Sequence, residues 1–202
     1  QFEGYQKPSL ELNVPMAELP RGRHDLILKK SGKGTLHYLT SYRYRLAGNQ
    51  PGRFQGLRVI RSIRPANQGQ VLREFDLYAK GEPLKLPPGQ VFDVGLEIIS
   101  DRPADRVVVT DPLPAGLEAV DASFQTSTSS LQARQSSWQI NYQQIYRDKV
   151  VAYGDKLDAG AYSLHYLVRS VTPGTFEWPG AEVHLQYTPE EFGRCTSSQL
   201  IL

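Results

Sequence analysis

The sequence predicts an all-β protein whose main domain is a β-sandwich. Short segments in which every second residue is apolar recur along the chain, and turns rich in Pro or Gly separate them. No long segment repeats its apolar residues with the helical period of about 3.6. Many short strands joined by turns, without helices between them, are typical of two packed antiparallel sheets.

Residues 1–46 contain short strand signals. Apolar residues predict strands at 10–14, 26–28 and 36–46, and the Gly-rich segment 31–34 predicts a hairpin loop. Because three short strands bury too little apolar surface to be stable alone, we expect them to pair with strands from elsewhere. The turn formers that follow, at 47–56, predict a linker.

Residues 57–202 carry the larger set of strands. The Ser-, Thr- and Gln-rich stretch 123–137 has few large apolar residues and predicts a mobile loop. A turn is expected at 111–116, and Pro189 ends the last predicted strand. The strands expected from alternating apolar residues lie within 57–63, 71–77, 92–98, 107–109, 138–142, 150–153, 162–169 and 183–187.

Composition excludes several classes of protein. The chain has 202 residues, of which 40% are hydrophobic and 22% charged, so it is globular rather than disordered. A net charge of +2 is too small and too dispersed to indicate a nucleic-acid partner. The apolar residues Val59, Ile60 and Ile63 lie between Arg58, Arg61 and Arg64, and we interpret the arginines as an ordinary solvated face rather than a binding patch.

The sequence shows no pattern of a transmembrane helix or a signal peptide, and it has a single cysteine. No apolar run approaches the roughly 18 residues of a transmembrane helix. The first residues lack the basic and apolar regions of a signal peptide, which leaves a cytosolic chain or a fragment of a larger protein. The single cysteine, Cys195, cannot form an internal disulfide and is expected to be a free or an intermolecular thiol.

The sequence contains none of the common catalytic or cofactor motifs, so we expect neither an enzyme nor a bound cofactor. The histidines His24, His37, His165 and His184 lack metal-ligand spacing. A site formed by His165 and His184 is conceivable, but solvent-facing strand positions are the favoured interpretation. The acidic group of Glu97, Asp101, Asp105 and Asp111 is interpreted as turn chemistry and ion pairing rather than as a calcium site.

Three blocks of sequence, at 110–118, 171–176 and 187–194, resemble segments of bacterial α-2-macroglobulins in the same order. The blocks read Thr-Asp-Pro-Leu-Pro-Ala-Gly-Leu-Glu, Val-Thr-Pro-Gly-Thr-Phe and Tyr-Thr-Pro-Glu-Glu-Phe-Gly-Arg. The resemblance implies half of a CUB-like β-domain over 1–46, the linker at 47–56, and an immunoglobulin-like macroglobulin sandwich over 57–202. It also implies a broad-spectrum inhibitor that traps proteases after they cleave a bait region.

The resemblance also implies a site. Alternation places Tyr187 on the core face with Val183 and Leu185, yet it also ends its strand, where a side chain can project. In the family, a tyrosine of this motif is thought to cover a reactive thioester, which implies that role for Tyr187, with Phe192 and Arg194 as weaker candidates. The covalent trap itself is not expected here, because Gln199 follows Cys195 at i+4 rather than at the i+3 of the family motif.

The implied partners are the thioester domain and other macroglobulin domains of the same parent chain, with target proteases bound through the intact parent. Unpaired strand edges in 1–46 would also permit a dimer. The implied location is the periplasm or cell envelope, with membrane anchoring through the parent chain. The alternative is a cell-surface adhesion or ligand-binding sandwich that uses an aromatic platform of Trp138, Tyr142 and Tyr146.

Overall fold

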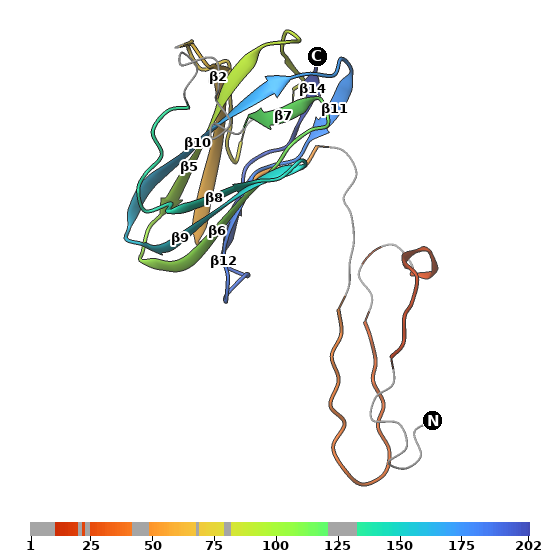
Figure 1. Cartoon of the computed structure of the whole chain (residues 1–202). Helices are drawn as coiled ribbons and strands as arrows, with labels where there is room; N and C mark the ends of the chain where they lie inside the picture. The colour runs from red at the N-terminus through yellow and green to blue at the C-terminus, as the bar shows by residue number, and fades with distance from the viewer. Residues whose placement is uncertain are drawn as a thin grey trace. The chain divides into compact units, whose positions relative to one another are not determined.

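The computed structural model describes residues 11–19, 22, 25–41, 49–67, 69–78, 82–120 and 133–202. The chain divides into two compact units, Gln1–Leu46 and Ala47–Leu202 (Figure 1). Within the described residues, no helix is long and apolar enough to cross a membrane.

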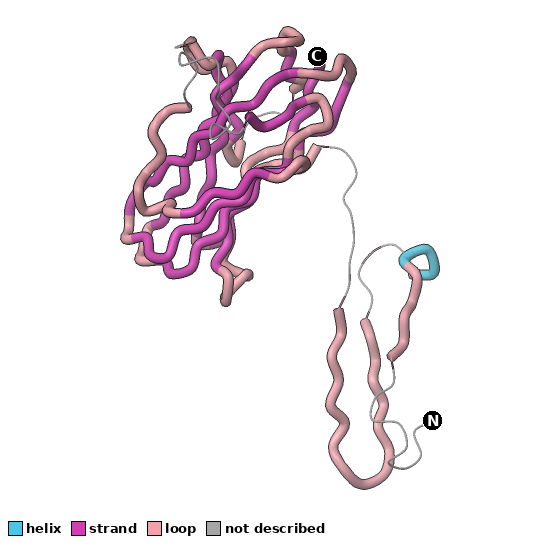
Figure 2. The backbone as a smooth tube through the Cα atoms, in the orientation of Figure 1, coloured by secondary structure: helices cyan, strands magenta, loops and turns pink. Residues whose placement is uncertain are grey.

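The described residues of the first unit have little regular structure. Its described residues form one short 3-10 helix, η1 (Met16–Glu18), and are otherwise drawn as loop (Figure 2). The strands expected at 10–14, 26–28 and 36–46 are not formed by the described part of these segments, while residues 10 and 42–46 lie outside it. Leu12, Ile27 and Leu39 are 82%, 72% and 95% exposed, because no second layer covers them within this unit. Without such a layer, extended segments gain too little from burial to hold a ladder.

The described residues of the second unit form three sheets. All strand pairs are antiparallel except the parallel pair of β14 with β4. The six-stranded sheet has the order β1 (Arg53–Gln55), β13 (Phe192–Arg194), β12 (Glu182–Leu185), β6 (Ala104–Pro112), β9 (Lys149–Leu157) and β8 (Tyr142–Ile145). The five-stranded sheet has the order β3 (Arg73–Phe75), β2 (Leu57–Pro65), β5 (Val91–Ser100), β10 (Gly160–Ser170) and β7 (Leu117–Val120). The three-stranded sheet has the order β11 (Thr175–Trp178), β14 (Ser198–Ile201) and β4 (Leu84–Lys85).

The period of two in the sequence builds the core. In β2, buried and half-buried residues alternate, so that Val59 and Ile63 are both fully buried. Val94 of β5 and Val109 of β6 are also completely enclosed, and they belong to one apolar cluster that joins both larger sheets. The predicted all-β class and its sandwich arrangement are confirmed.

Three local expectations need correction. The segment 47–56, expected to be a linker, includes β1, which pairs with β13. The strand expected at 138–142 begins only at Tyr142, because Ile140 N–H donates to Ser137 O and closes a turn that leaves Trp138 83% exposed. Part of the expected mobile loop, residues 133–137, is instead bonded to β10: the Ser137 N–H donates to the Ser163 carbonyl at 2.8 Å. Residues 123–132 of that loop lie outside the described part.

Candidate interdomain contact site

The sequence singled out the connection between β12 and β13, which we call the β12–β13 tip, residues 186–191. Figure 1 shows it as a short loop that extends beyond β12 at one end of the sandwich. Its backbone is held by Gln186 N–H, which donates to the Arg106 carbonyl at 2.9 Å, and by Glu191 N–H, which donates to the Thr188 carbonyl at 2.9 Å. The Glu191 carboxylate also pairs with the Arg102 guanidinium. The tip is therefore braced against the chain around β6.

Tyr187 projects from this tip and is 78% exposed. Of the two positions that the sequence left open for Tyr187, the core face and the projecting end of the strand, the structure has the second, because β12 ends at Leu185 and the alternation of the strand ends with it. A tyrosine exposed to this degree leaves most of its ring in water, on a backbone that is fixed by hydrogen bonds.

Phe192 and Arg194 lie on β13, and both are half-buried. Cross-strand pairing puts Phe192 opposite His184 and Arg194 opposite Glu182, so both face away from the core. Arg194 lines a hollow of about 330 Å³, together with Glu182 and Ser197. Its Nε is buried without a hydrogen-bond partner among the described groups. The two residues therefore share one outer face, which begins where the tip ends.

This outer face carries a row of side chains that crosses the whole six-stranded sheet. The register places the following residues side by side, one from each strand in sheet order: Gln55, Phe192, His184, Val108, Tyr153 and Tyr142. Tyr153 and Tyr142 are 37% and 53% exposed, and their ring centroids are 5.8 Å apart. An aromatic residue thus lies near each end of the row.

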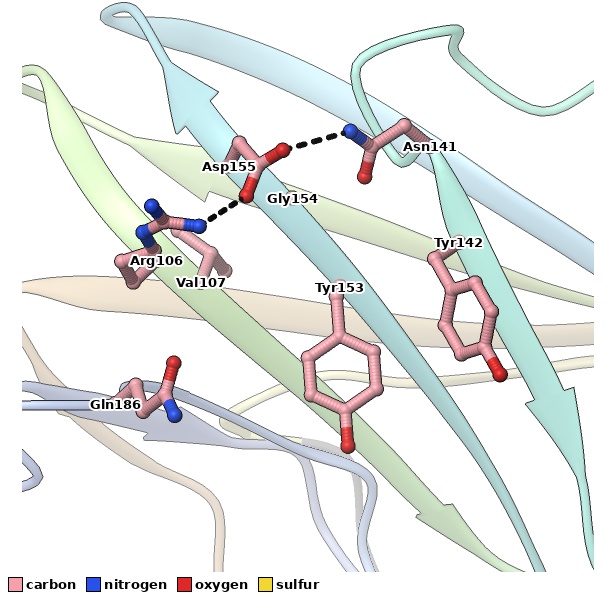
Figure 3. A pocket seen from close by; sticks show the side chains of 8 residues that line it. All are labelled: Arg106, Val107, Asn141, Tyr142, Tyr153, Gly154, Asp155 and Gln186. Atoms are coloured by element: carbon pink, nitrogen blue, oxygen red, sulfur yellow. Dashed lines mark hydrogen bonds and ion pairs between the residues drawn. The ribbon is translucent and has the colours of Figure 1, made fainter.

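The aromatic platform suggested by the sequence is only partly formed. Tyr142 lies beside Tyr153, which the sequence analysis did not single out, and both line a hollow of about 530 Å³ (Figure 3). Trp138 and Tyr146 are not among the residues that line it. Tyr146 is instead within reach of the Lys149 ammonium, which lies 5.4 Å from the ring centroid.

The histidines that could have formed a metal site do not converge. His165 is on the five-stranded sheet and His184 on the six-stranded sheet, so the conceivable two-histidine site is not formed. No group of three candidate metal ligands occurs among the described residues, and His24 lies outside them. In the acidic group, Asp101 and Asp105 are exposed whereas Asp111 is fully buried.

Sequence reasoning missed a buried polar network centred on Arg61. The interpretation of Arg61 as solvated is wrong: its side chain is 0% exposed, because the period of two places it on the same face as Val59 and Ile63. Arg61 Nη1 lies 2.8 Å from Asp111 Oδ1 and donates to the Pro179 carbonyl, also at 2.8 Å. Val59 and Ile63 lie two positions before and after Arg61, and these apolar neighbours were the signal that could have placed Arg61 on the buried face.

Aromatic residues complete the network. Tyr166 O–H donates to Asp111 Oδ2 at 2.6 Å, and the Arg61 guanidinium carbon lies 4.1 Å from the Trp178 ring centroid and 4.8 Å from that of Phe75. Burial alone lowers the pKa of Arg61, but the charge of Asp111, together with smaller contributions from Cys195, Tyr166 and the hydrogen bond to Asp111, outweighs burial and raises that pKa above its ordinary value. Burial and the same carboxylate raise the pKa of Tyr166 well above its ordinary value, so its hydroxyl stays a donor.

A second polar cluster fixes the segment 133–137 against the five-stranded sheet. The Asp93 carboxylate accepts from the Arg134 N–H at 2.9 Å and lies 2.9 Å from His165 Nδ1. Burial alone raises the pKa of Asp93, but the hydrogen bonds with His165 and Arg134, together with the electrostatic attraction of His165 and Arg64, outweigh burial and lower the pKa. Gly95 lies under the His165 ring: a Cβ there would come within 2.8 Å of the ring carbon Cε1.

The family model described as bacterial α-2-macroglobulin MG10 domain matches residues 56–190. The chain is 64% identical to an α-2-macroglobulin homolog of Nostoc sp. over 202 residues, which is 100% of this chain and 11% of that protein. The resemblance proposed from the three sequence blocks is confirmed.

Solved structures share the fold. A Salmonella α-2-macroglobulin reacted with methylamine matches with a TM-score of 0.53 and 24% identity, over 76% of this chain and 10% of that one. An Escherichia coli α-2-macroglobulin activated by porcine elastase matches with a TM-score of 0.59 and 22% identity, over 75% and 13%. The chain thus spans about a tenth of the length of these relatives. Because the MG10 model covers more than half of its residues, the chain belongs to the family of bacterial α-2-macroglobulin MG10 domains.

Proposed function

We propose that this chain is the C-terminal module of a bacterial α-2-macroglobulin, a broad-spectrum inhibitor that traps proteases, and that it has no catalytic role of its own. In this proposal the β12–β13 tip packs against the thioester domain of the same protein until the bait region is cleaved. The observation that carries the proposal is Tyr187, which is 78% exposed on a tip whose backbone is held by hydrogen bonds.

The chemistry of a thioester explains why such a residue is useful. A thioester reacts with water and amines that reach it, so a ring placed over it slows both reactions. Covering most of a tyrosine side chain removes on the order of 100 Å² from water, which stabilises the closed state by about 3 kcal/mol. That free energy changes a population ratio by about a hundredfold. Tyr187 alone can therefore separate a protected from an exposed state.

Cleavage can release the tip only if its contacts differ between the uncleaved and cleaved molecules. Two relatives support this view of the whole protein. One, from Salmonella, has been reacted with methylamine, and another, from Escherichia coli, has been activated by porcine elastase. We extend amine reactivity and protease activation to the protein that contains this chain.

The test uses the intact protein that contains this chain. Thiol release is followed during methylamine treatment in the wild type and in Tyr187→Ala, with an untreated sample as the baseline. Cys195 is 0% exposed and is expected to stay silent under native conditions. We expect thiol release in the wild type, and release at least about tenfold faster in Tyr187→Ala, since losing the ring forfeits more than about 1.4 kcal/mol.

Two variants serve as controls. Tyr187→Phe keeps the ring and is expected to react nearly as slowly as the wild type. Tyr78→Ala removes a tyrosine of similar exposure, 84%, from a different loop and is expected to change nothing. Equal rates in all variants would show that Tyr187 does not protect the thioester, and no thiol release from the wild type would remove the thioester from the proposal.

The remaining assignments concern the intact protein. We propose a periplasmic or cell-envelope location, with any membrane anchor supplied by another part of the parent chain. Residues 1–46, proposed as half of a CUB-like domain, would then pair with the rest of that domain or, failing that, with a second copy. Cell fractionation with an antibody against this chain tests the location, and recovery in the cytosolic fraction would refute it.

A further inference from the structure

We propose that the hollow on the outer face of the six-stranded sheet is a binding site for a saccharide ring. Figure 3 shows the hollow, which has a volume of about 530 Å³ and lies over β6, β9 and the start of β8. That volume is in the range of small-ligand sites. The side chains that line it include those of Arg106, Asn141, Tyr142, Tyr153, Asp155 and Gln186.

The polar side of the hollow is pre-organised. Arg106 Nη1 lies 2.6 Å from Asp155 Oδ1, and Asn141 Nδ2 donates to Asp155 Oδ2 at 3.0 Å. Each group keeps hydrogen-bonding capacity, because a carboxylate accepts about four bonds and a guanidinium donates five. The result is a row of planar groups that offers both donors and acceptors, as Figure 3 shows.

The apolar side consists of two tyrosine rings. Tyr142 and Tyr153 have ring centroids 5.8 Å apart and planes inclined by 47°, so they cannot sandwich one flat ring between parallel faces. An inclined pair instead fits a puckered ring that presents C–H groups to the aromatic faces. The hydroxyl groups on the rim of the same ring both donate and accept, which matches the polar row.

The backbone conformation of Arg106 independently supports a binding site at this hollow. Among the described residues other than glycine, only Arg106 has a positive φ, of 55°. This left-handed conformation is strained for a side chain with a Cβ, and such strain concentrates at functional sites. It turns the Arg106 carbonyl toward Gln186 N–H, which donates to it at 2.9 Å. A glycine would adopt this backbone conformation without strain.

Other ligand classes fit less well. The Asp155 carboxylate lies 2.6 Å from the Arg106 guanidinium and neutralises it, so the hollow does not favour a phosphate or another anion. A flat nucleobase would find only one ring face at a time, because of the inclination of the two tyrosines. A purely apolar ligand would leave the polar row without partners.

The experiment titrates the intact protein with chitotriose, cellotriose and maltotriose by isothermal calorimetry. We expect at least one trisaccharide to bind with a Kd below about 1 mM. We expect Tyr153→Ala and Arg106→Gly each to weaken that binding at least about tenfold. Arg106→Gly removes the guanidinium while allowing the left-handed backbone, so its unfolding midpoint should not fall.

Tyr146→Ala is the matched control, since it removes an exposed tyrosine that directly follows β8 and does not line the hollow. Pull-down with insoluble chitin and cellulose tells a polymer-binding site from one for short soluble sugars. Binding that Tyr146→Ala weakens as much as Tyr153→Ala would overturn the proposal. Absence of binding to all three trisaccharides and both polymers would overturn it as well, and would favour a protein surface at this hollow.

Discussion

Removing the carboxylate of Asp111 should destabilise the sandwich more than almost any other single change. In Asp111→Ala, the Arg61 guanidinium stays buried with the Pro179 carbonyl as its remaining polar partner, and the Tyr166 hydroxyl loses its acceptor. Two Arg61 nitrogens, Nε and Nη2, already lack hydrogen-bond partners among the described groups. The variant therefore leaves a cation uncompensated at the centre of the core.

The magnitude follows from the burial. Both side chains of the pair are 0% exposed. Breaking a buried ion pair by removing one partner costs about 3–5 kcal/mol, whereas the whole stability of a domain is about 5–15 kcal/mol. For a unit of this size, about 4 kcal/mol corresponds to a fall in Tm of roughly 8–16 °C.

The assay is urea and thermal unfolding of the chain, followed by circular dichroism and by the fluorescence of buried Trp178. Glu191→Ala is the control, because it breaks the pair with Arg102, whose side chain is 60% exposed, and should cost less than about 1 kcal/mol. The double variant Arg61→Met with Asp111→Leu should be more stable than Asp111→Ala, since it removes both charges. A loss below about 1 kcal/mol in Asp111→Ala, or a double variant less stable than the single one, would refute the reasoning.

Three further predictions follow from the same core. Because the folded pKa of Asp93 is lowered, the folded chain binds fewer protons than the unfolded chain near the ordinary pKa of about 4. The stability that Asp93 contributes is thus present above that pH and is lost as the pH falls through the folded pKa. Asp93→Asn should lower the free energy of unfolding at pH 7, and its difference from the wild type should shrink in acid; a difference independent of pH would contradict this. Gly193→Ala should destabilise by about 1–3 kcal/mol in urea unfolding, because its Cβ would come within 2.2 Å of the Leu57 carbonyl oxygen, and an unchanged midpoint would show that the strands can separate there. Burial raises the pKa of the Cys195 thiol, so iodoacetamide should label it only after unfolding, as mass spectrometry can check, and labelling of the native chain would disprove its enclosure.

Much of the sandwich could be predicted because a strand with one buried face has an apolar residue at every second position of its sequence. The alternation around Val94 in β5 and around Leu164 in β10 appears directly as buried residues in register. The family could also be predicted, because three blocks of the sequence resemble segments of that family in the same order. The strand signals within 1–46 did not become strands among the described residues, since an alternating pattern needs a second layer to bury it.

For the candidate site, local sequence patterns identified residues but did not determine which of them are buried. The sequence singled out Tyr187, but whether it lies in the core or in water depends on β12 ending at Leu185, a boundary set by the neighbouring strand and the tip. The sequence analysis grouped Arg61 with Arg58 and Arg64 because they are evenly spaced along the chain. The period of a strand, however, places Arg61 on the buried face and Arg58 and Arg64 on the opposite face.

The sequence by itself determined the fold class, the family and the choice of Tyr187 in the β12–β13 tip as a candidate site residue. Only the tertiary structure decided which polar groups meet, as with Arg61 and Asp111, which are 50 positions apart, or Tyr142 and Tyr153, which lie on neighbouring strands. The physical reason is range. Strand periodicity and turn chemistry are local properties of a chain, whereas burial of a charge and the pairing of side chains across sheets depend on the register of segments that are distant in sequence.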